Sequence, residues 1–192
     1  MKPTLSEKRK EFEQDLCSYL LVVSPSPDRC PAACEFSGNA LLPVGYVPFA
    51  EIRMKPAFEA TVVRWIRNIC RLHAPFTLEM NNYTVRPPSN ICIQLLETGS
   101  LSRLSSHLGV LDSFLAASGC PPVVILKRPV MVIAEHTMTS SFFETALDFS
   151  QRDCTGSIPV DHVRLVRLGI AGAMEVADSF VLSAAVVNDH AA

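Results

Sequence analysis

The stretch KRPVMVIAEHT, residues 127–137, decides how this chain folds. Its centre, residues 130–134, is an uninterrupted apolar run rich in β-branched side chains, which is typical of a buried strand. The run ends in a polar tail that carries His136 and Thr137. The stretch therefore predicts a strand over residues 129–135, and it raises the question of whether His136 is a catalytic group at the end of that strand.

A second stretch, GYVPFAEIRMK at residues 45–55, is the natural comparison. Side chains alternate between the two faces of a strand, so Ile52 and Met54 share one face while Phe49 and Glu51 share the other. In both parts of the chain, a strand that begins near a proline is followed by a helical pattern and then by another strand. The two copies have almost the same spacing, which predicts an internal repeat.

Periodicity places the other elements. Strands are expected over 18–24, 76–83, 91–97, 122–126, 156–160, 162–168 and 179–187. Helices are expected over 6–16, from Pro56, over 101–115 and from Ser141. The apolar stripe expected on the second helix is Phe58, Val62, Trp65, Ile69 and Leu72, and that on the third is Leu101, Leu104, Leu108, Leu111 and Leu115, with Gly119 closing the third helix.

The repeat predicts an α+β fold with two lobes related by a pseudo-twofold axis, in which strands 46–54 and 129–135 lie near the centres of two antiparallel sheets and face each other. Each lobe would contain an antiparallel sheet with outer helices, and a central cleft between the lobes would be the default place for a ligand. We expect one domain over residues 1–192, with lobes of approximately 16–97 and 98–187, and strand exchange between the lobes is left open. An ordinary α+β sandwich with coincidental spacing is the alternative.

Composition limits the classes of function. Hydrophobic residues make up 48% and charged residues 19% of the chain, which argues against disorder, and a net charge of −2 disfavours nonspecific binding to duplex nucleic acid. We expect no membrane span, no metal and no cofactor. The seven cysteines are scattered, with Cys30 and Cys34 as the one close pair, so reduced thiols in a cytoplasmic protein are expected.

The order of these elements resembles the 2H phosphoesterase superfamily, which includes 2′-5′ RNA ligase-like proteins and cyclic phosphodiesterases. The resemblance runs from about residue 16 to residue 185. Lys-Arg-Pro-Val-Met-Val-Ile-Ala at 127–134 lies where that superfamily has the signature Pro-His-x-Thr-Ile-Ala, and VPFAEI at 47–52 lies where its first signature should be. Strand alternation puts the His and Thr of each motif on one face. The resemblance implies two such motifs across a cleft, one histidine acting as base and the other as acid at a phosphate.

This sequence departs from the motif at its functional positions. The histidine and threonine of the second motif fall on Val130 and Val132. Those of the first motif fall on Phe49 and Glu51, because that register keeps Ile52 on the core face, and a register on Pro48 and Ala50 stays open. The predicted cleft positions that replace the motifs are therefore Phe49, Glu51, Val130 and Val132.

None of the five histidines begins a His-x-Thr or His-x-Ser motif. His136 lies roughly 20 Å further along an extended strand than Val130, so it is expected to flank the next helix rather than to act as a catalyst. We therefore predict no catalytic residue from the standard motifs.

The resulting hypothesis is a 2′-5′ RNA ligase-like fold that has lost catalysis and binds a small molecule, a nucleotide-like ligand or a partner through an altered cleft. The alternative is an active phosphodiesterase or RNA ligase that uses non-standard residues. Glu51 would be the central charge of the cleft, paired with an arginine such as Arg53. Lys127 and Arg128 are candidate anion contacts at the cleft rim, or else a solvated strand end.

Overall fold

The structure is a computed structural model, and it describes six segments of the chain. These are residues 16–23, 46–86, 90–96, 99–135, 140–169 and 173–183. The helix expected over 6–16, the close pair Cys30 and Cys34, and His136 lie outside the described residues.

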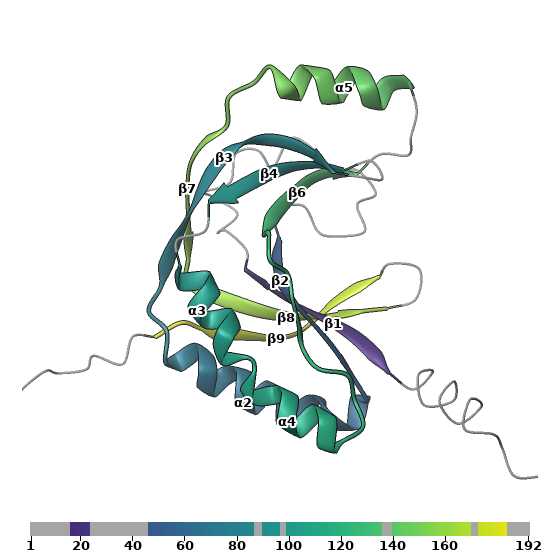
Figure 1. Cartoon of the computed structure of the whole chain (residues 1–192), viewed down its shortest axis with the longest axis vertical. Helices are drawn as coiled ribbons and strands as arrows, with labels where there is room; N and C mark the ends of the chain where they lie inside the picture. The colour runs from purple at the N-terminus through teal and green to yellow at the C-terminus, as the bar shows by residue number, and fades with distance from the viewer. Residues whose placement is uncertain are drawn as a thin grey trace, which may run out of the picture.

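Nine strands form two antiparallel sheets in the described part of the chain (Figure 1). Sheet A has the order β5-β2-β1-β8-β9, and sheet B has the order β6-β4-β3-β7. The strands of sheet A are β1 (Cys17–Val23), β2 (Val47–Met54), β5 (Val124–Ile125), β8 (His162–Leu168) and β9 (Met174–Val181). Those of sheet B are β3 (Phe76–Arg86), β4 (Asn90–Leu96), β6 (Val130–Glu135) and β7 (Thr155–Val160). These sheets confirm the predicted α+β class.

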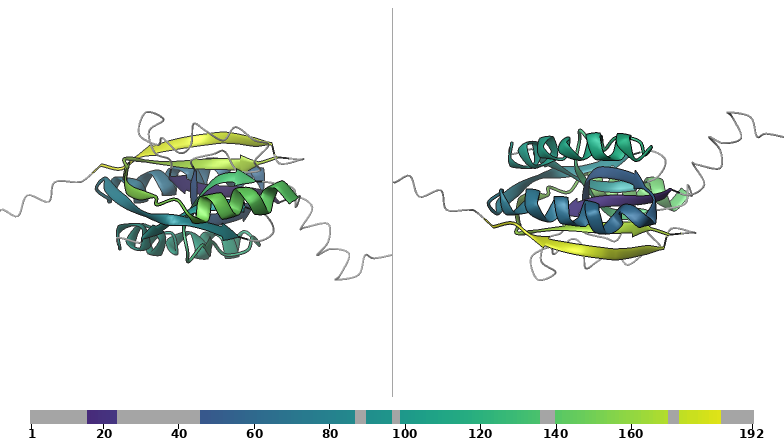
Figure 2. Two further views of the ribbon diagram at one scale, coloured as in Figure 1. Left: turned by 90° about the horizontal axis from the view of Figure 1, so that it is seen from above. Right: turned by 90° about the horizontal axis from the view of Figure 1, so that it is seen from below.

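The helices cover the outer sides of the two sheets. They are the 3-10 turn η3 (Pro56–Phe58), α2 (Glu59–Arg71), α3 (Ser100–His107), α4 (Val110–Ala117) and α5 (Ser140–Ser150). Helix α2 packs against β9, and α5 packs against β3 at the opposite end of the molecule (Figure 1). Seen from above and below, β8 and β9 run along one side of the molecule and α3 and α4 along the other (Figure 2).

Each sheet takes strands from both halves of the chain. Sheet A combines β1 and β2 with β5, β8 and β9, whereas sheet B combines β3 and β4 with β6 and β7. Strand β2 is internal to sheet A, between β5 and β1. Strand β6 forms the edge of sheet B, although the repeat had placed its sequence near the centre of a sheet. The two strands contact each other, which brings the two predicted motif regions to one place, the β2–β6 junction.

Two helical predictions need correction. The buried face of α2 consists of Val62, Ile66, Ile69 and Cys70, the spacing of a helix face that points into a core. Trp65 is 41% exposed and Leu72 is 68% exposed, so the predicted stripe was wrong at these positions. The buried positions are spaced i, i+4, i+7 and i+8 from Val62, so Trp65 falls at the edge of that face, and Leu72 lies past the last helical residue, Arg71.

The helix expected over residues 101–115 is divided into α3 and α4. The break lies at Gly109, a poor helix former, where the amides of Gly109 and Asp112 bond to carbonyls three residues earlier, at Ser106 and Gly109. The five leucines of the predicted stripe are all buried despite the break. Gly119 ends α4 as predicted, with a left-handed φ of 74° that favours glycine.

The main core is one continuous cluster that joins both sheets and the four helices. It includes Tyr19 from β1, Ile66 from α2, Leu104 from α3, Ile93 from β4 and Phe149 from α5. Two smaller buried clusters lie outside it, one on each sheet. Together with the main core, they show that β1, β4 and β6 have buried side chains on both faces.

Candidate functional site

A β-bulge in β2 decides where the first predicted motif lies. Leu21 of β1 is paired with Ala50 and the next residue, Val22, is paired with Pro48, so Phe49 has no partner on β1. A bulge of this kind rotates the side chains on one side of it relative to the other. As a result both Phe49 and Ala50 belong to the main core, and β2 follows neither of the two alternating registers considered from the sequence.

Phe49 is 1% exposed and belongs to the same core cluster as Ile52. Its side chain therefore does not share a face with Glu51. Strict alternation had predicted that the two side chains would lie on the same face. The extra residue of the bulge accounts for the difference, because it changes which side chains of β2 point to the core.

Glu51 lies on the other face of sheet A. It stands directly opposite Leu20 of β1, and residues paired across antiparallel strands share a face. Leu20, Val22 and Val166 form the small buried cluster of that face. Within the described residues Glu51 forms no salt bridge, so the expected pair with Arg53 is absent there. Glu51 is thus a partly buried carboxylate next to an apolar patch.

Val130 and Val132 are brought together by β6, on the face of sheet B opposite Met131 and Ile133. They are 8% and 6% exposed and form a separate buried cluster with Cys92 of β4. Cys92 is the cross-strand partner of Val132, which explains why the three side chains meet. We call these three residues the valine patch. The resemblance implies a histidine at the position of Val130 and a threonine at the position of Val132.

A pocket of about 250 Å³ opens beside the β2–β6 junction. Phe49 lines it together with Leu101 and Ser105 of α3 and with Lys127 and Pro129, which precede β6. Lys127, one of the two predicted anion contacts, is exposed and lines this pocket. Arg128 is also exposed but does not line this pocket. The pocket therefore has an apolar wall, and the cationic side chain of Lys127 lies at its edge.

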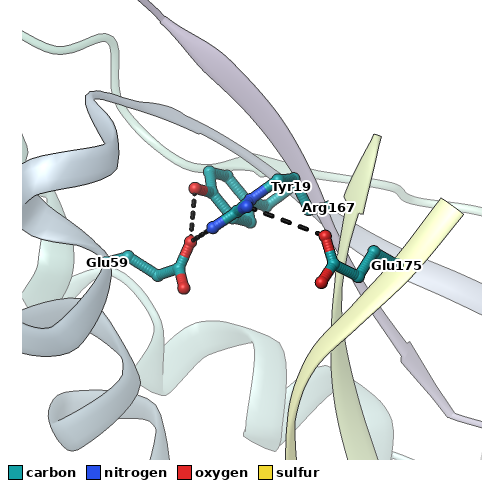
Figure 3. Close-up of polar contacts among 4 residues, drawn as sticks. All are labelled: Tyr19, Glu59, Arg167 and Glu175. Carbon is teal, nitrogen blue, oxygen red and sulfur yellow. Dashed lines mark hydrogen bonds and ion pairs between the residues drawn. The ribbon is translucent and has the colours of Figure 1, made fainter. Parts of the chain in front are cut away.

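A polar cluster that the sequence did not reveal joins α2 to sheet A (Figure 3). The Tyr19 hydroxyl donates a 2.6 Å hydrogen bond to the Glu59 carboxylate, which also forms an ion pair with Arg167. The Arg167 guanidinium lies over the Tyr19 ring, 5.6 Å from its centroid, and 3.7 Å from the Glu175 carboxylate. Burial raises the pKa of Tyr19 to about 12, and the hydrogen bond to Glu59 adds to that effect. Each member contacts at least one other member, so the cluster ties α2 to β1, β8 and β9.

This cluster should make stability depend on pH in the acid range. Burial raises the pKa of Glu59, but the hydrogen bonds from Tyr19 and Arg167 and the charge of Arg167 outweigh it, so the folded pKa lies below 4.5. A carboxyl with a depressed folded pKa stabilises the protein above its unfolded pKa and loses that contribution as pH falls. We expect Glu59→Gln to lower the free energy of unfolding by about 1 kcal/mol at pH 7 and by much less near pH 3.

Urea denaturation at several pH values measures this dependence. Exposed Glu144→Gln on α5 removes the same charge outside the cluster and is the matched control. An equal loss for Glu59→Gln at pH 7 and at acid pH would show that the carboxylate does not stabilise α2 through its charge.

Other chemistry is sparse in the described segments. The five cysteines found there, Cys17, Cys70, Cys92, Cys120 and Cys154, form no disulfide bond, and burial raises the pKa of Cys70 to about 12. No group of three or more His, Cys, Asp or Glu side chains in those segments could hold a metal ion. None of the helices described is both long and apolar enough to cross a membrane.

Comparisons with known proteins identify the fold. No family model matches the chain, and no curated protein matches it at the sequence level. Among solved structures, the protein TT0787 of Thermus thermophilus superimposes with a TM-score of 0.57 at 17% identity, over 88% of this chain and 99% of that one. E. coli LigT complexed with 3′-AMP gives a TM-score of 0.55 at 13% identity, over 87% and 98%.

A third structure, described as a phosphoesterase, gives a TM-score of 0.53 at 16% identity, over 87% of this chain and 98% of that one. LigT has also been crystallised with NADP⁺, with ATP and with phosphate. The order of strands and helices expected from the sequence thus has its counterpart in solved proteins, and the chain has the fold of E. coli LigT and of the solved phosphoesterase.

Proposed function

We propose that this protein is a 2H phosphoesterase-like protein without catalytic activity, which binds a small ligand through an altered cleft. The observation that supports this proposal most strongly is the valine patch. The resemblance assigns the positions of a proton-transferring histidine and a hydroxyl donor to Val130 and Val132, and these two side chains pack with Cys92 in a buried apolar cluster. Hydrocarbon side chains can neither transfer a proton nor stabilise a developing charge.

The opposing strand supplies no replacement. Phe49 is buried in the main core, and Glu51 stands next to Leu20. A carboxylate repels a phosphate, and a single carboxylate provides one proton-transfer group where the two-histidine mechanism needs two. The motif positions on the two strands therefore supply neither the acid–base pair nor the imidazole and hydroxyl donors that would hold phosphate oxygens.

The apolar surroundings also disfavour a phosphate as ligand. Moving a charged group from water to an apolar surface without hydrogen bonds is strongly unfavourable, whereas burying an apolar side chain against a ligand contributes roughly 1.5–3 kcal/mol. The solved LigT complexes contain adenine nucleotides. For this chain we propose a nucleotide-like or other small ligand that is held through an aromatic or apolar portion, with Lys127 at the edge of the nearby pocket available to an anionic tail.

A turnover assay tests the loss of catalysis. We expect no hydrolysis of 2′,3′-cyclic nucleotides and no joining of 2′-5′ RNA ends above the rate without protein, with or without a metal chelator. Glu51→Gln should leave this background unchanged, because Glu51 has no second proton-transfer partner among the described residues.

The alternative, an active enzyme with non-standard residues, predicts a different pattern. Turnover that persists in the presence of chelator and disappears in Glu51→Gln would establish a carboxylate mechanism and contradict the proposal. Arg53→Gln, which alters an exposed residue on the same face of β2, controls for a general loss of charge there.

A further inference from the structure

Two histidines that are 34 residues apart in the chain lie side by side where α2 and α3 end. The Nε2 atom of His73 and the Nδ1 atom of His107 are 2.9 Å apart, so one nitrogen donates a hydrogen bond to the other. The ring centroids are 4.8 Å apart. Both side chains line a pocket of about 310 Å³ that also includes Ser100 and Arg103 of α3. This pocket is separate from the one beside Phe49.

The polar lining of this pocket consists of donors and cations. Arg103 and His107 on α3 are the charged or titratable side chains that line it with His73, and Ser100 adds a hydroxyl. The loop and β3 residues that complete the lining are uncharged. Within the described residues Arg103 forms no ion pair, and its Nε atom donates a weak 3.3 Å hydrogen bond to the Gly99 carbonyl. The guanidinium charge of Arg103 is therefore not neutralised by a carboxylate in that part of the chain.

The charge distribution favours an anion over a metal cation. Two imidazole nitrogens this close could chelate a divalent cation, but Arg103 would repel it and no carboxylate in the lining would offset that repulsion. Burial lowers the pKa of His73, and the charges of His107 and Arg103 lower it further. Burial and the charge of Arg103 thus both oppose a positive charge on His73, and a bound anion would offset that effect.

We propose that the pocket between His73, His107 and Arg103 binds the phosphate group of a small ligand. Arg103 supplies charge-assisted hydrogen bonds to the phosphate oxygens, as guanidinium groups do at many phosphate sites. The two imidazole rings supply further donors, and His73 takes up a proton when the anion binds. This site is independent of the valine patch, and it assigns phosphate recognition to a different surface from the β2–β6 junction.

Calorimetry and NMR of the full chain test this site with inorganic phosphate and with sulfate. We expect saturable shifts of the His73 and His107 ring signals, and about a tenfold weaker phosphate affinity in Arg103→Gln. Arg71→Gln removes the same charge from an exposed residue of α2 outside the pocket lining and should leave the affinity unchanged. Sulfate keeps its charge across neutral pH, so its affinity should rise at least about threefold from pH 8 to pH 6 as His73 gains a proton.

Three results would overturn the proposal. The first is the absence of a saturable response of the two rings to either anion at millimolar concentration, in protein shown to be folded by circular dichroism. The second is an equal loss of affinity in Arg71→Gln and Arg103→Gln, which would indicate nonspecific surface charge. The third is Zn²⁺ binding at the two rings with no anion response. None of these results bears on the valine patch, whose own methyl signals report separately on the proposed function.

Discussion

Truncation of Phe49 to alanine should lower the free energy of unfolding by about 3–5 kcal/mol, the range found for large aromatic side chains removed from a core. Phe49 is 1% exposed and packs in the main core. Its neighbour in the predicted motif, Glu51, is only partly buried and forms no salt bridge in the described segments. Glu51→Ala should therefore change stability by less than about 1 kcal/mol. The measurement is urea denaturation at neutral pH.

Phe143 on α5 is 65% exposed and provides a matched control. Phe143→Ala removes the same atoms from a surface position and should have an effect below about 1 kcal/mol. If Phe49→Ala proved equally mild, Phe49 would not be a core residue, and the bulge in β2 would not have moved it away from the face of Glu51.

Restoring the motif on β6 should create phosphate binding. We expect the double variant Val130→His, Val132→Thr to bind inorganic phosphate at the β2–β6 junction at least about tenfold more tightly than the wild type, because an imidazolium and a hydroxyl provide charge-assisted donors where the wild type has hydrocarbon. The same change should lower stability by about 1–3 kcal/mol, since polar groups replace apolar ones next to Cys92.

The readout must distinguish this site from the histidine pocket. Chemical shifts of β6 residues report on the junction, and a background of Arg103→Gln removes the contribution expected from the other site. Val181→His, at a position 56% exposed on β9, adds a histidine to a strand surface without a facing strand motif and should not bind phosphate. Equal phosphate binding by the wild type and the double variant would contradict the idea that the valine patch replaced a phosphate site.

Much of the fold was predictable because it depends on local patterns. Apolar, β-branched runs locate β1, β2 and β6, and the five buried leucines locate α3 and α4. The order of these elements was enough to suggest the two-sheet fold that the solved structures share. Alternation on β6 also placed Val130 and Val132 on a common face, which the buried cluster with Cys92 confirms.

The features that the sequence did not reveal depend on partners that are distant along the chain. The bulge at Phe49 arises from the pairing of β2 with β1, and a strand read alone shows only its own alternation. The edge position of β6 depends on the order of strands in the sheet. Glu59 meets Arg167 across 108 residues, and His73 meets His107 across 34. No spacing rule connects residues so far apart.

A methyl NMR titration of the wild-type protein with inorganic phosphate tests most directly whether the valine patch has replaced a phosphate site. We predict that the methyl signals of Val130 and Val132 stay unchanged up to millimolar phosphate, while the ring signals of His73 and His107 shift. A saturable shift of the two valines, abolished by excess 2′,3′-cyclic AMP, would show that the β2–β6 junction still binds phosphate and would contradict the account.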